Sequence, residues 1–329
     1  MMKKNRLFSI IKILLTTTIL AVIVYFISVE LQRNRLQFGD IMDNINWLPL
    51  SAAVGSLIAY FLIASVGLRF LLNRGAPPVK LSVAGNFGII NISGLTKYLP
   101  GKVWSYAIMF FALNEIGMPL SKAVLDSMIH LILTVATPIL LMIPVAVFAF
   151  LPRLSMLVKI VLITSGVSVY VLCLVFSPIL LKIILRVVNT FRKKEPILYS
   201  LVNRKDIFKT QGIVLSGYFF YVLSVVIVIF SIDQNANWSS AIQIAVFCVF
   251  SAIVGFLALF VPGGLGVQES LIYFYATVNH ADPGFALLLP IVVRLVSVIT
   301  DLMVGLTSLW LIRKIAAKVV FAKKQKVIK

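Results

Sequence analysis

The sequence has few of the residues that build soluble enzymes and metal sites. Only 12% of its 329 residues are charged, and 11 Asp and Glu stand against 30 Lys and Arg. A typical soluble domain is about one-quarter charged, so this composition excludes an ordinary soluble protein. Two Cys and two His are too few for a disulfide framework or a structural metal site. We therefore expect no metal, no cofactor and no redox role.

The chain is instead rich in apolar sequence. Hydrophobic residues make up 60% of it, and they come in blocks of about 20, the length at which a helix crosses the hydrocarbon core. This predicts an all-α polytopic membrane protein. The net charge of +19 is then explained by the positive-inside rule and by anionic headgroups, and no nucleic-acid partner is expected.

Six apolar blocks are predicted to be full transmembrane helices, at residues 7–29, 47–72, 120–151, 156–181, 210–232 and 285–312. The first is too long for the apolar core of a signal peptide and is interpreted as a retained helix. Basic residues gather in the loop 182–209 and in the tail 313–329, so both are expected to be cytoplasmic. The expected location is the plasma membrane, with both termini in the cytoplasm.

Two further apolar regions, 81–113 and 241–278, are interrupted by Pro-Gly pairs and are predicted to be re-entrant hairpins. The pieces 81–92 and 102–113 are too short to span a membrane, whereas 241–260 is long enough, so full crossings stay open for the second region. Irregular backbone persists at membrane depth only where it is buried in protein or lines a wet cavity.

The two breaks resemble each other. Leu99-Pro100-Gly101 and Val261-Pro262-Gly263 share an apolar-Pro-Gly core, and an Asn-initiated turn follows each. Interrupted segments at corresponding places predict inverted repeats with a site between them, although Pro-Gly pairs also arise by chance in turns. The expected single domain, 1–329, comprises the first helix and external loop 1–46, a first repeat 47–151, a linking segment 152–209, a second repeat 210–312 and the tail 313–329.

The same segments carry a family resemblance. Ser93-Gly94 with Tyr98–Trp104, and Pro262–Glu269, resemble the transmembrane region of lysylphosphatidylglycerol synthases. The resemblance implies a flippase-like membrane protein that acts on a phospholipid or lipid-linked substrate, beside partner enzymes of lipid modification or surface-glycan assembly. The synthases also carry a soluble catalytic domain. Because this chain ends at Lys329 with a short basic tail, we expect it not to be an enzyme.

Charged groups at membrane depth are costly, which makes each a candidate site. Lys97 and Lys102 flank the first Pro-Gly tip, where they would hold a lipid phosphate at the start of the next half-helix, or extend to the headgroups. The predicted substrate-binding residues are Lys97, Pro100, Gly101, Lys102, Pro262, Gly263, Gly264, Gly266, Glu269, Arg294 and Asp301.

The second break has two interpretations. Its glycines would let the backbone approach a headgroup, or would form a tight helix-packing turn. Arg294 would pair with Glu269 or with Asp301, either as a structural pair or as a gate or headgroup contact. Asp126 and His130, one helical turn apart, would relay a proton or simply occupy a polar position near the cytoplasm.

The expected function is transport of an anionic, aminoacylated or glycan-linked phospholipid. One alternative is a membrane glycosyltransferase that uses a lipid-phosphate donor, with Asp40 and Asp43 of the first external loop as its acids. Another is an accessory subunit of surface-glycan assembly. Association into a homo-oligomer stays open.

Overall fold

The computed structural model describes residues 46–74, 80–95, 103–191, 203–258, 261–279 and 281–327. Within these residues the chain is helical apart from short turns and forms no strand. The predicted first helix, 7–29, lies outside the described residues, as do Lys97, Pro100, Gly101 and Lys102.

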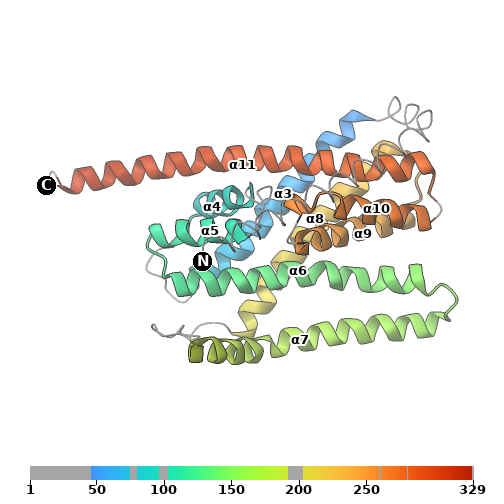
Figure 1. Ribbon diagram of the computed structural model, residues 1–329, viewed down its shortest axis with the longest axis horizontal. Helices are drawn as coiled ribbons and strands as arrows, with labels where there is room; N and C mark the ends of the chain where they lie inside the picture. Colours follow the sequence, from blue (N-terminus) through green and yellow to red (C-terminus); the bar gives the residue numbers. More distant parts are fainter. Residues whose placement is uncertain are drawn as a thin grey trace, which may run out of the picture. The chain divides into compact units, whose positions relative to one another are not determined.

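The described helices (Figure 1) are α3 (Trp47–Asn73), α4 (Val83–Leu95), α5 (Val103–Glu115), α6 (Leu120–Phe150), α7 (Met156–Phe191), α8 (Arg204–Ile232), α9 (Trp238–Leu257), the short 3₁₀ helix η2 (Pro262–Gly264), α10 (Val267–Val278) and α11 (Pro283–Val327). Six of them are long and apolar enough to cross a membrane: α3, α6, α7 through Ser177, α8, α9 and α11 through Ile312. The prediction of an all-helical, multi-pass membrane protein is confirmed.

Five of these six helices coincide with predicted crossings, with ends shifted by a few residues. The sixth, α9, falls in the second predicted hairpin and is 20 residues long. In the first hairpin, α4 and α5 have 13 residues each, about 20 Å of helix, which is shorter than a hydrocarbon core. Re-entry of either region, and the inverted repeat, stay predictions.

Several helices begin at a side chain that caps the first free backbone N–H groups. Asn46 accepts from Leu48 N–H before α3, and Asn203 accepts from Asp206 N–H before α8. Asn237 accepts from the N–H groups of residues 239 and 240 at the start of α9, and Asp282 from those of 284 and 285 at α11. These polar residues between apolar blocks therefore define where the helices start.

The chain divides into two compact units, which are described separately. The first contains the described residues among 46–57, 103–104 and 221–300, and the second contains those among 58–95, 105–220 and 301–327. In the first unit, α9 and α10 pack against each other on either side of η2. In the second unit, α7 packs along α6 as its antiparallel neighbour (Figure 1).

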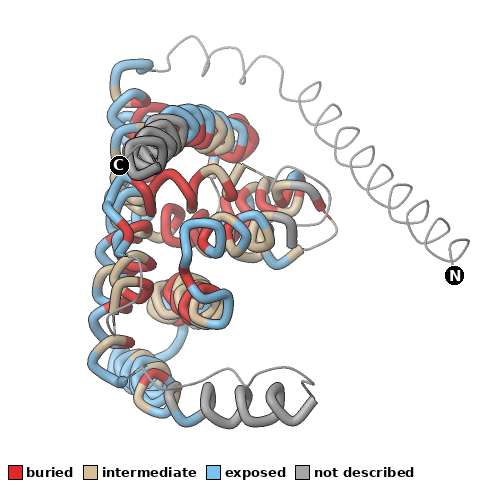
Figure 2. The backbone as a smooth tube through the Cα atoms, turned by 90° about the vertical axis from the view of Figure 1, so that its left-hand side faces the viewer, coloured by how far each residue is buried: buried red, intermediate tan, exposed pale blue. Residues whose placement is uncertain are grey.

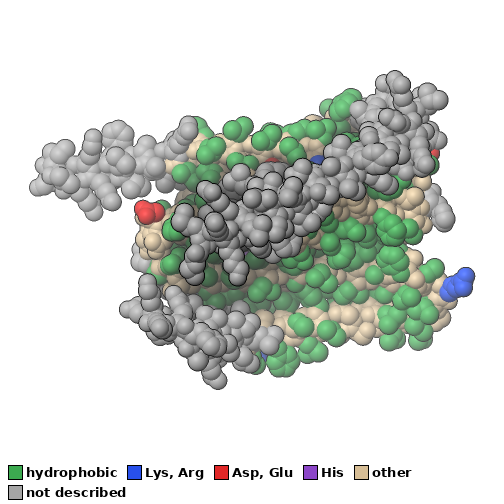
Figure 3. Space-filling view, in the orientation of Figure 1, with side chains coloured by type: hydrophobic (Ala, Val, Ile, Leu, Met, Phe, Trp, Pro, Cys, Tyr) green, Lys and Arg blue, Asp and Glu red, His purple; other side chains and the backbone are tan. Residues whose placement is uncertain are grey.

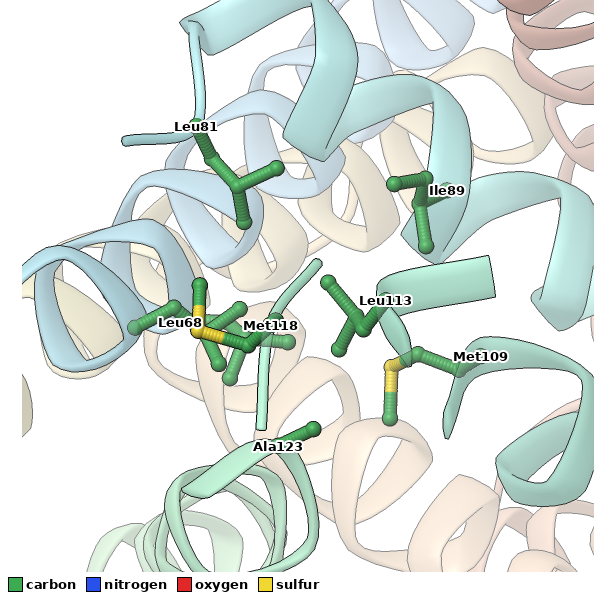
Figure 4. Close-up of a cluster of buried hydrophobic side chains, with 8 residues drawn as sticks. Leu68, Leu81, Ile89, Met109, Leu113, Met118 and Ala123 are labelled. Atoms are coloured by element: carbon green, nitrogen blue, oxygen red, sulfur yellow. The ribbon is translucent and has the colours of Figure 1, made fainter. Parts of the chain in front are cut away.

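The two short helices of the second unit cover a buried apolar cluster. Its members come from α3, α4, α5, α6 and the segments between them, and their side chains converge (Figure 4): Leu68, Leu72, Leu81, Ile89, Met109, Leu113, Met118 and Ala123. All are almost fully buried. This burial packs α4 and α5 against α3 and α6.

Hydrogen bonds between helices supplement this packing. In the second unit, Gln211 Nε2 donates to Thr137 Oγ1 at 2.9 Å, and the Tyr218 hydroxyl donates to the carbonyl oxygen of Thr134 at 2.9 Å. In the first unit, Ser224 Oγ donates to the carbonyl oxygen of Ala53 at 2.7 Å. Each such bond in a membrane protein contributes on the order of 0.6 kcal/mol, so they select helix partners more than they drive association.

Helix α7 exposes apolar side chains between Met156 and Ser177. Only 6% of its most apolar window is buried, and Leu157 is 72% exposed. Figure 2 shows exposed positions running along the described helices beside buried ones, and Figure 3 shows hydrophobic side chains over α6 and α7. A soluble protein rarely exposes so much contiguous apolar surface. These faces are suited to contact lipid chains.

Candidate functional site

The Pro-Gly-Gly loop of the first unit forms a sharp turn between α9 and α10. It begins as the 3₁₀ turn Pro262–Gly264, and φ is +61° at Gly263, +68° at Gly264 and +81° at Gly266. Only glycine adopts such values without strain. A Cβ on Gly264 would also lie 2.7 Å from the carbonyl oxygen of Gly255 on α9. Glycine is thus required here by both conformation and packing.

The side chain of Arg294, on α11, binds a backbone carbonyl group of this loop. Its Nη1 and Nη2 atoms both donate to the carbonyl oxygen of Gly263, each at 3.1 Å, and Nη1 also lies 3.4 Å from Oε1 of Gln268. A guanidinium group donates through a rigid fork, so two bonds to one oxygen fix both the loop and the arginine. The long-range contact between residues 263 and 294 closes the turn onto α11.

Glu269 completes the arrangement. Its Oε2 accepts from the N–H of Gly266 at 2.5 Å, and its Oε1 lies 3.5 Å from Arg294 Nε. The carboxylate therefore caps the first turn of α10, where the helix dipole favours negative charge, and neutralises the arginine. The two side chains are only 15% and 16% exposed. Pairing lowers the cost of placing both charges in an apolar environment.

The structure thus brings together Gly263, Gly264, Gly266, Glu269 and Arg294 from the predicted set, with Pro262 at the start of the turn. Of the two predicted partners for Arg294, it pairs the arginine with Glu269. Asp301 belongs to the second unit, where its carboxylate interacts electrostatically with Tyr60, and its pairing with Arg294 stays a prediction.

A second set of charges, in the other unit, surrounds Asp126. Its carboxylate, with 1% of the side chain exposed, lies 2.7 Å from Arg74 Nη2 and 2.8 Å from Lys122 Nζ, and Arg74 Nη1 lies 3.3 Å from Asp206 Oδ2. His130 instead lies beside the carbonyl oxygen of Ala64, at 3.0 Å from Nε2. The two residues proposed as a relay therefore have separate partners.

Sequence reasoning did not find the pairing of Arg74 with two carboxylates. The sequence does contain a local signal for one part of the network, because Lys122 and Asp126 are four residues apart on one helix face. Arg74 has no such local signal, since its partners are 52 and 132 residues away in sequence.

The first unit also contains a cavity of about 260 Å³ that no motif indicated. Asp233, Asn237, Asn279 and Asp282, from the turns that flank α9 and α10, contribute to its wall together with Tyr275. The Tyr275 ring stacks on Phe247, and its buried hydroxyl has no hydrogen-bond partner among the described residues. The only sequence signal was the concentration of Asn and Asp in these two turns.

The described His, Cys, Asp and Glu residues do not form a metal centre. Within the described parts of the chain, no three His, Cys, Asp or Glu side chains are grouped so that they could hold an ion. The charged side chains described above form ion pairs with one another and hydrogen bonds with backbone groups. Their arrangement fixes the Gly263 loop to α11 and joins α3, α6 and α8 within apolar surroundings.

The helices and the paired charges define the class: a multi-pass helical membrane protein with polar sites enclosed among apolar helices. The particular family follows from comparison with known proteins. The sequence model of the lysylphosphatidylglycerol synthase TM region matches residues 9–305, and the chain belongs to this family. No curated protein and no solved structure gives a significant match. The family places the protein in a lipid-related membrane context.

Proposed function

We propose that the protein is a lipid transporter that moves an anionic, aminoacylated or glycan-linked phospholipid across the plasma membrane, and that it carries out no covalent chemistry. The observation that carries the proposal is the linked arrangement of Gly263, Glu269 and Arg294 in a chain of this family. It combines a fixed cation, a fixed anion and a glycine backbone turn next to helices long enough to cross the membrane.

The physical problem of lipid transport explains why such an arrangement would be useful. A phospholipid headgroup is charged, and its passage through hydrocarbon is as costly as that of a charged side chain. Polar groups that are already fixed in place replace part of its hydration. A glycine turn offers backbone at close range, and the Glu269–Arg294 pair offers charge of both signs to a headgroup that approaches it.

The predicted topology supplies the setting. Both termini would be cytoplasmic, so basic loops would face anionic headgroups of the inner leaflet. Enzymes of lipid modification or surface-glycan assembly would then be partners that produce or consume the transported lipid.

The test is transport in reconstituted vesicles. Purified protein would be inserted into liposomes that contain fluorescent phospholipids with different headgroups, and dithionite would be added outside. Without transport, only the outer-leaflet label is bleached. We expect additional bleaching with wild-type protein that depends on the headgroup and is strongly reduced by Arg294→Gln.

Lys159→Gln on α7 is the matched control and should transport like wild type, because its ammonium contacts only described residues outside the Gly263 loop: it donates to the carbonyl oxygen of Pro152 and lies 5.2 Å from the centre of the Phe148 ring. Folding of each variant would be verified by circular dichroism and gel filtration. Bleaching no greater than in protein-free vesicles for every headgroup, with folded protein, would contradict the proposal.

A further inference from the structure

One face of α6 carries polar side chains in the second unit. Ser127, His130, Thr134 and Thr137 are three or four residues apart, so they lie on the same face of the helix. Helix α6 is one of those long and apolar enough to cross a membrane, and Ser127 and Thr137 are almost fully buried. Polar side chains at membrane depth are costly and commonly mark a functional path, so this face needs an explanation.

Helix α8 supplies hydrogen-bond partners to this face. Gln211 Nε2 donates to Thr137 Oγ1 at 2.9 Å. Pro138 has no N–H, so the carbonyl oxygen of Thr134, four residues earlier, has no donor within the helix. The Tyr218 hydroxyl donates to that oxygen instead, at 2.9 Å. Ser127, Thr134 and Thr137 of α6 thus form a polar seam with Gln211 and Tyr218 of α8.

Several oxygen atoms of the polar seam have no hydrogen-bond partner among the described residues. They are Ser127 Oγ, Thr134 Oγ1 and Gln211 Oε1, and all are buried. A buried polar atom without a partner is unfavourable. Because these atoms are buried, no ligand reaches them in this conformation, but a conformation that admits water to the seam would satisfy them. The unpartnered atoms therefore favour opening of the seam.

An ionic contact opposes this opening where the seam begins. Asp126 directly precedes Ser127 on α6 and lies 2.7 Å from Arg74, whereas Asp206 at the start of α8 lies 3.3 Å from the same arginine. The Asp126 side chain is 1% exposed and that of Asp206 is 20% exposed. Asp206 also accepts from the N–H of Asn203, so its carboxylate keeps a partner when the arginine is released. The Arg74–Asp206 contact, which we call the latch, is therefore the more readily broken of the two.

We propose that the polar seam is a path by which water enters the second unit, and that the latch closes its end. Release of Asp206 frees the first turns of α8 from α6, and water then reaches Ser127 first and Thr134 and Gln211 beyond it. Arg74 stays attached to α6 through Asp126, so the latch can close again. The inference goes beyond the proposed function, because the seam is in the second unit and its opening requires no transport.

Cysteine reactivity in the purified full chain tests the proposal. Ser127→Cys or Thr134→Cys would be introduced with Cys173→Ala and Cys248→Ala, and treated with an uncharged, water-soluble thiosulfonate. The thiolate is the reactive form and needs water, so the rate reports how often water reaches the position. Asp206→Asn keeps the size of the side chain and a capping oxygen but removes the charge of the latch. We expect it to raise the rate at both positions roughly 3- to 10-fold, as the loss of a partly exposed ion pair allows.

The matched control is Glu115→Gln, which removes one negative charge from an exposed position at the end of α5 in the same unit. It should leave both rates unchanged. Val304→Cys, a buried position on α11 in the second unit, reports general loosening and should stay unreactive in every background. An equal rise at Val304→Cys would reduce the effect to loss of packing and overturn the proposal, as would seam rates that Asp206→Asn does not change.

A measurement with the latch intact covers the case in which Asp206→Asn does not fold. Salt screens a partly exposed ion pair, so a higher ionic strength should increase the rates at Ser127→Cys and Thr134→Cys but not at Val304→Cys. In that case, seam rates that do not respond to salt would overturn the proposal. Because thiol modification requires no movement of lipid, a failed vesicle assay leaves this result intact.

Discussion

Arg294 shows how a single side chain can organise an interrupted membrane segment. Its guanidinium makes two bonds to the carbonyl oxygen of Gly263, and its Nε faces Glu269. Loss of the arginine would remove the support of the loop and leave a carboxylate nearly buried without its counter-charge. Loss of Arg294 would therefore affect both stability and the proposed transport. A transport assay alone would not separate the two effects.

The first prediction concerns this pair. Arg294→Gln should destabilise the protein by about 1–3 kcal/mol, because it leaves the Glu269 carboxylate without its counter-charge and the Gly263 carbonyl oxygen without the arginine donors. Adding Glu269→Gln to Arg294→Gln should cost less than the sum of the two single changes. Thermal unfolding in detergent measures each value, and strict additivity would show that the two side chains do not interact energetically.

The second prediction concerns Lys97 and Lys102, which flank the first Pro-Gly tip outside the described residues. If either holds the lipid phosphate, Lys→Gln removes a charge-assisted bond worth about 1.5–3 kcal/mol, and transport should fall roughly 10- to 100-fold at matched expression. A lysine whose ammonium already lies in water should lose little. Wild-type transport in both single variants and in the double variant would exclude these lysines from the mechanism.

At the scale of elements, the break between α9 and α10 is a defined turn that several independent interactions stabilise. Glycine conformations reverse the chain, Gly264 packs directly on Gly255, and Glu269 caps the helix that follows. Such a turn lets two apolar helices of the first unit pack against each other, and the Gly263 carbonyl oxygen and the Gly266 N–H in the turn are hydrogen-bonded.

The third prediction tests that turn. Gly264→Ala should cost about 1–2 kcal/mol from its left-handed conformation alone, with a further cost from a Cβ at 2.7 Å from the Gly255 carbonyl oxygen. Gly55→Ala is the matched control: it lies inside α3, and a Cβ there meets nothing within 4 Å. That change should be neutral or stabilising by up to about 1 kcal/mol. Similar melting temperatures for the two variants would contradict the described turn.

At the scale of the whole molecule, six described helices are long enough to cross a membrane, and the predicted first helix lies outside the described residues. Helix length alone does not assign a side of the membrane to either terminus. The distribution of Lys and Arg does so, because cytoplasmic loops retain positive charge. The orientation is therefore a prediction from charge that labelling can test.

The fourth prediction is the orientation itself. In a background without Cys173 and Cys248, a cysteine placed at Gln234 should react with a membrane-impermeant maleimide added outside intact cells. A cysteine at Lys193 should react only after the membrane is opened. Labelling of both positions from the same side would rule out the predicted topology.

Much of the fold could be predicted from the sequence, because hydropathy and helix length are local properties. The apolar blocks at 47–72, 120–151, 156–181, 210–232 and 285–312 correspond to described helices, and the short pieces of 81–113 are short helices in the structure. The need for glycine after Pro262 could be predicted too, since a Pro-Gly-Gly sequence strongly favours a turn.

Tertiary structure decided which distant residues meet. The sequence left Glu269 and Asp301 as alternative partners for Arg294, and the fold pairs the arginine with Glu269 and with the backbone of Gly263. It also joins Arg74 to Asp126 and Asp206, which are 52 and 132 residues away in sequence. The reason is physical. Burial makes an unpaired charge costly wherever it lies, but only the packing of helices determines which opposite charge is within reach.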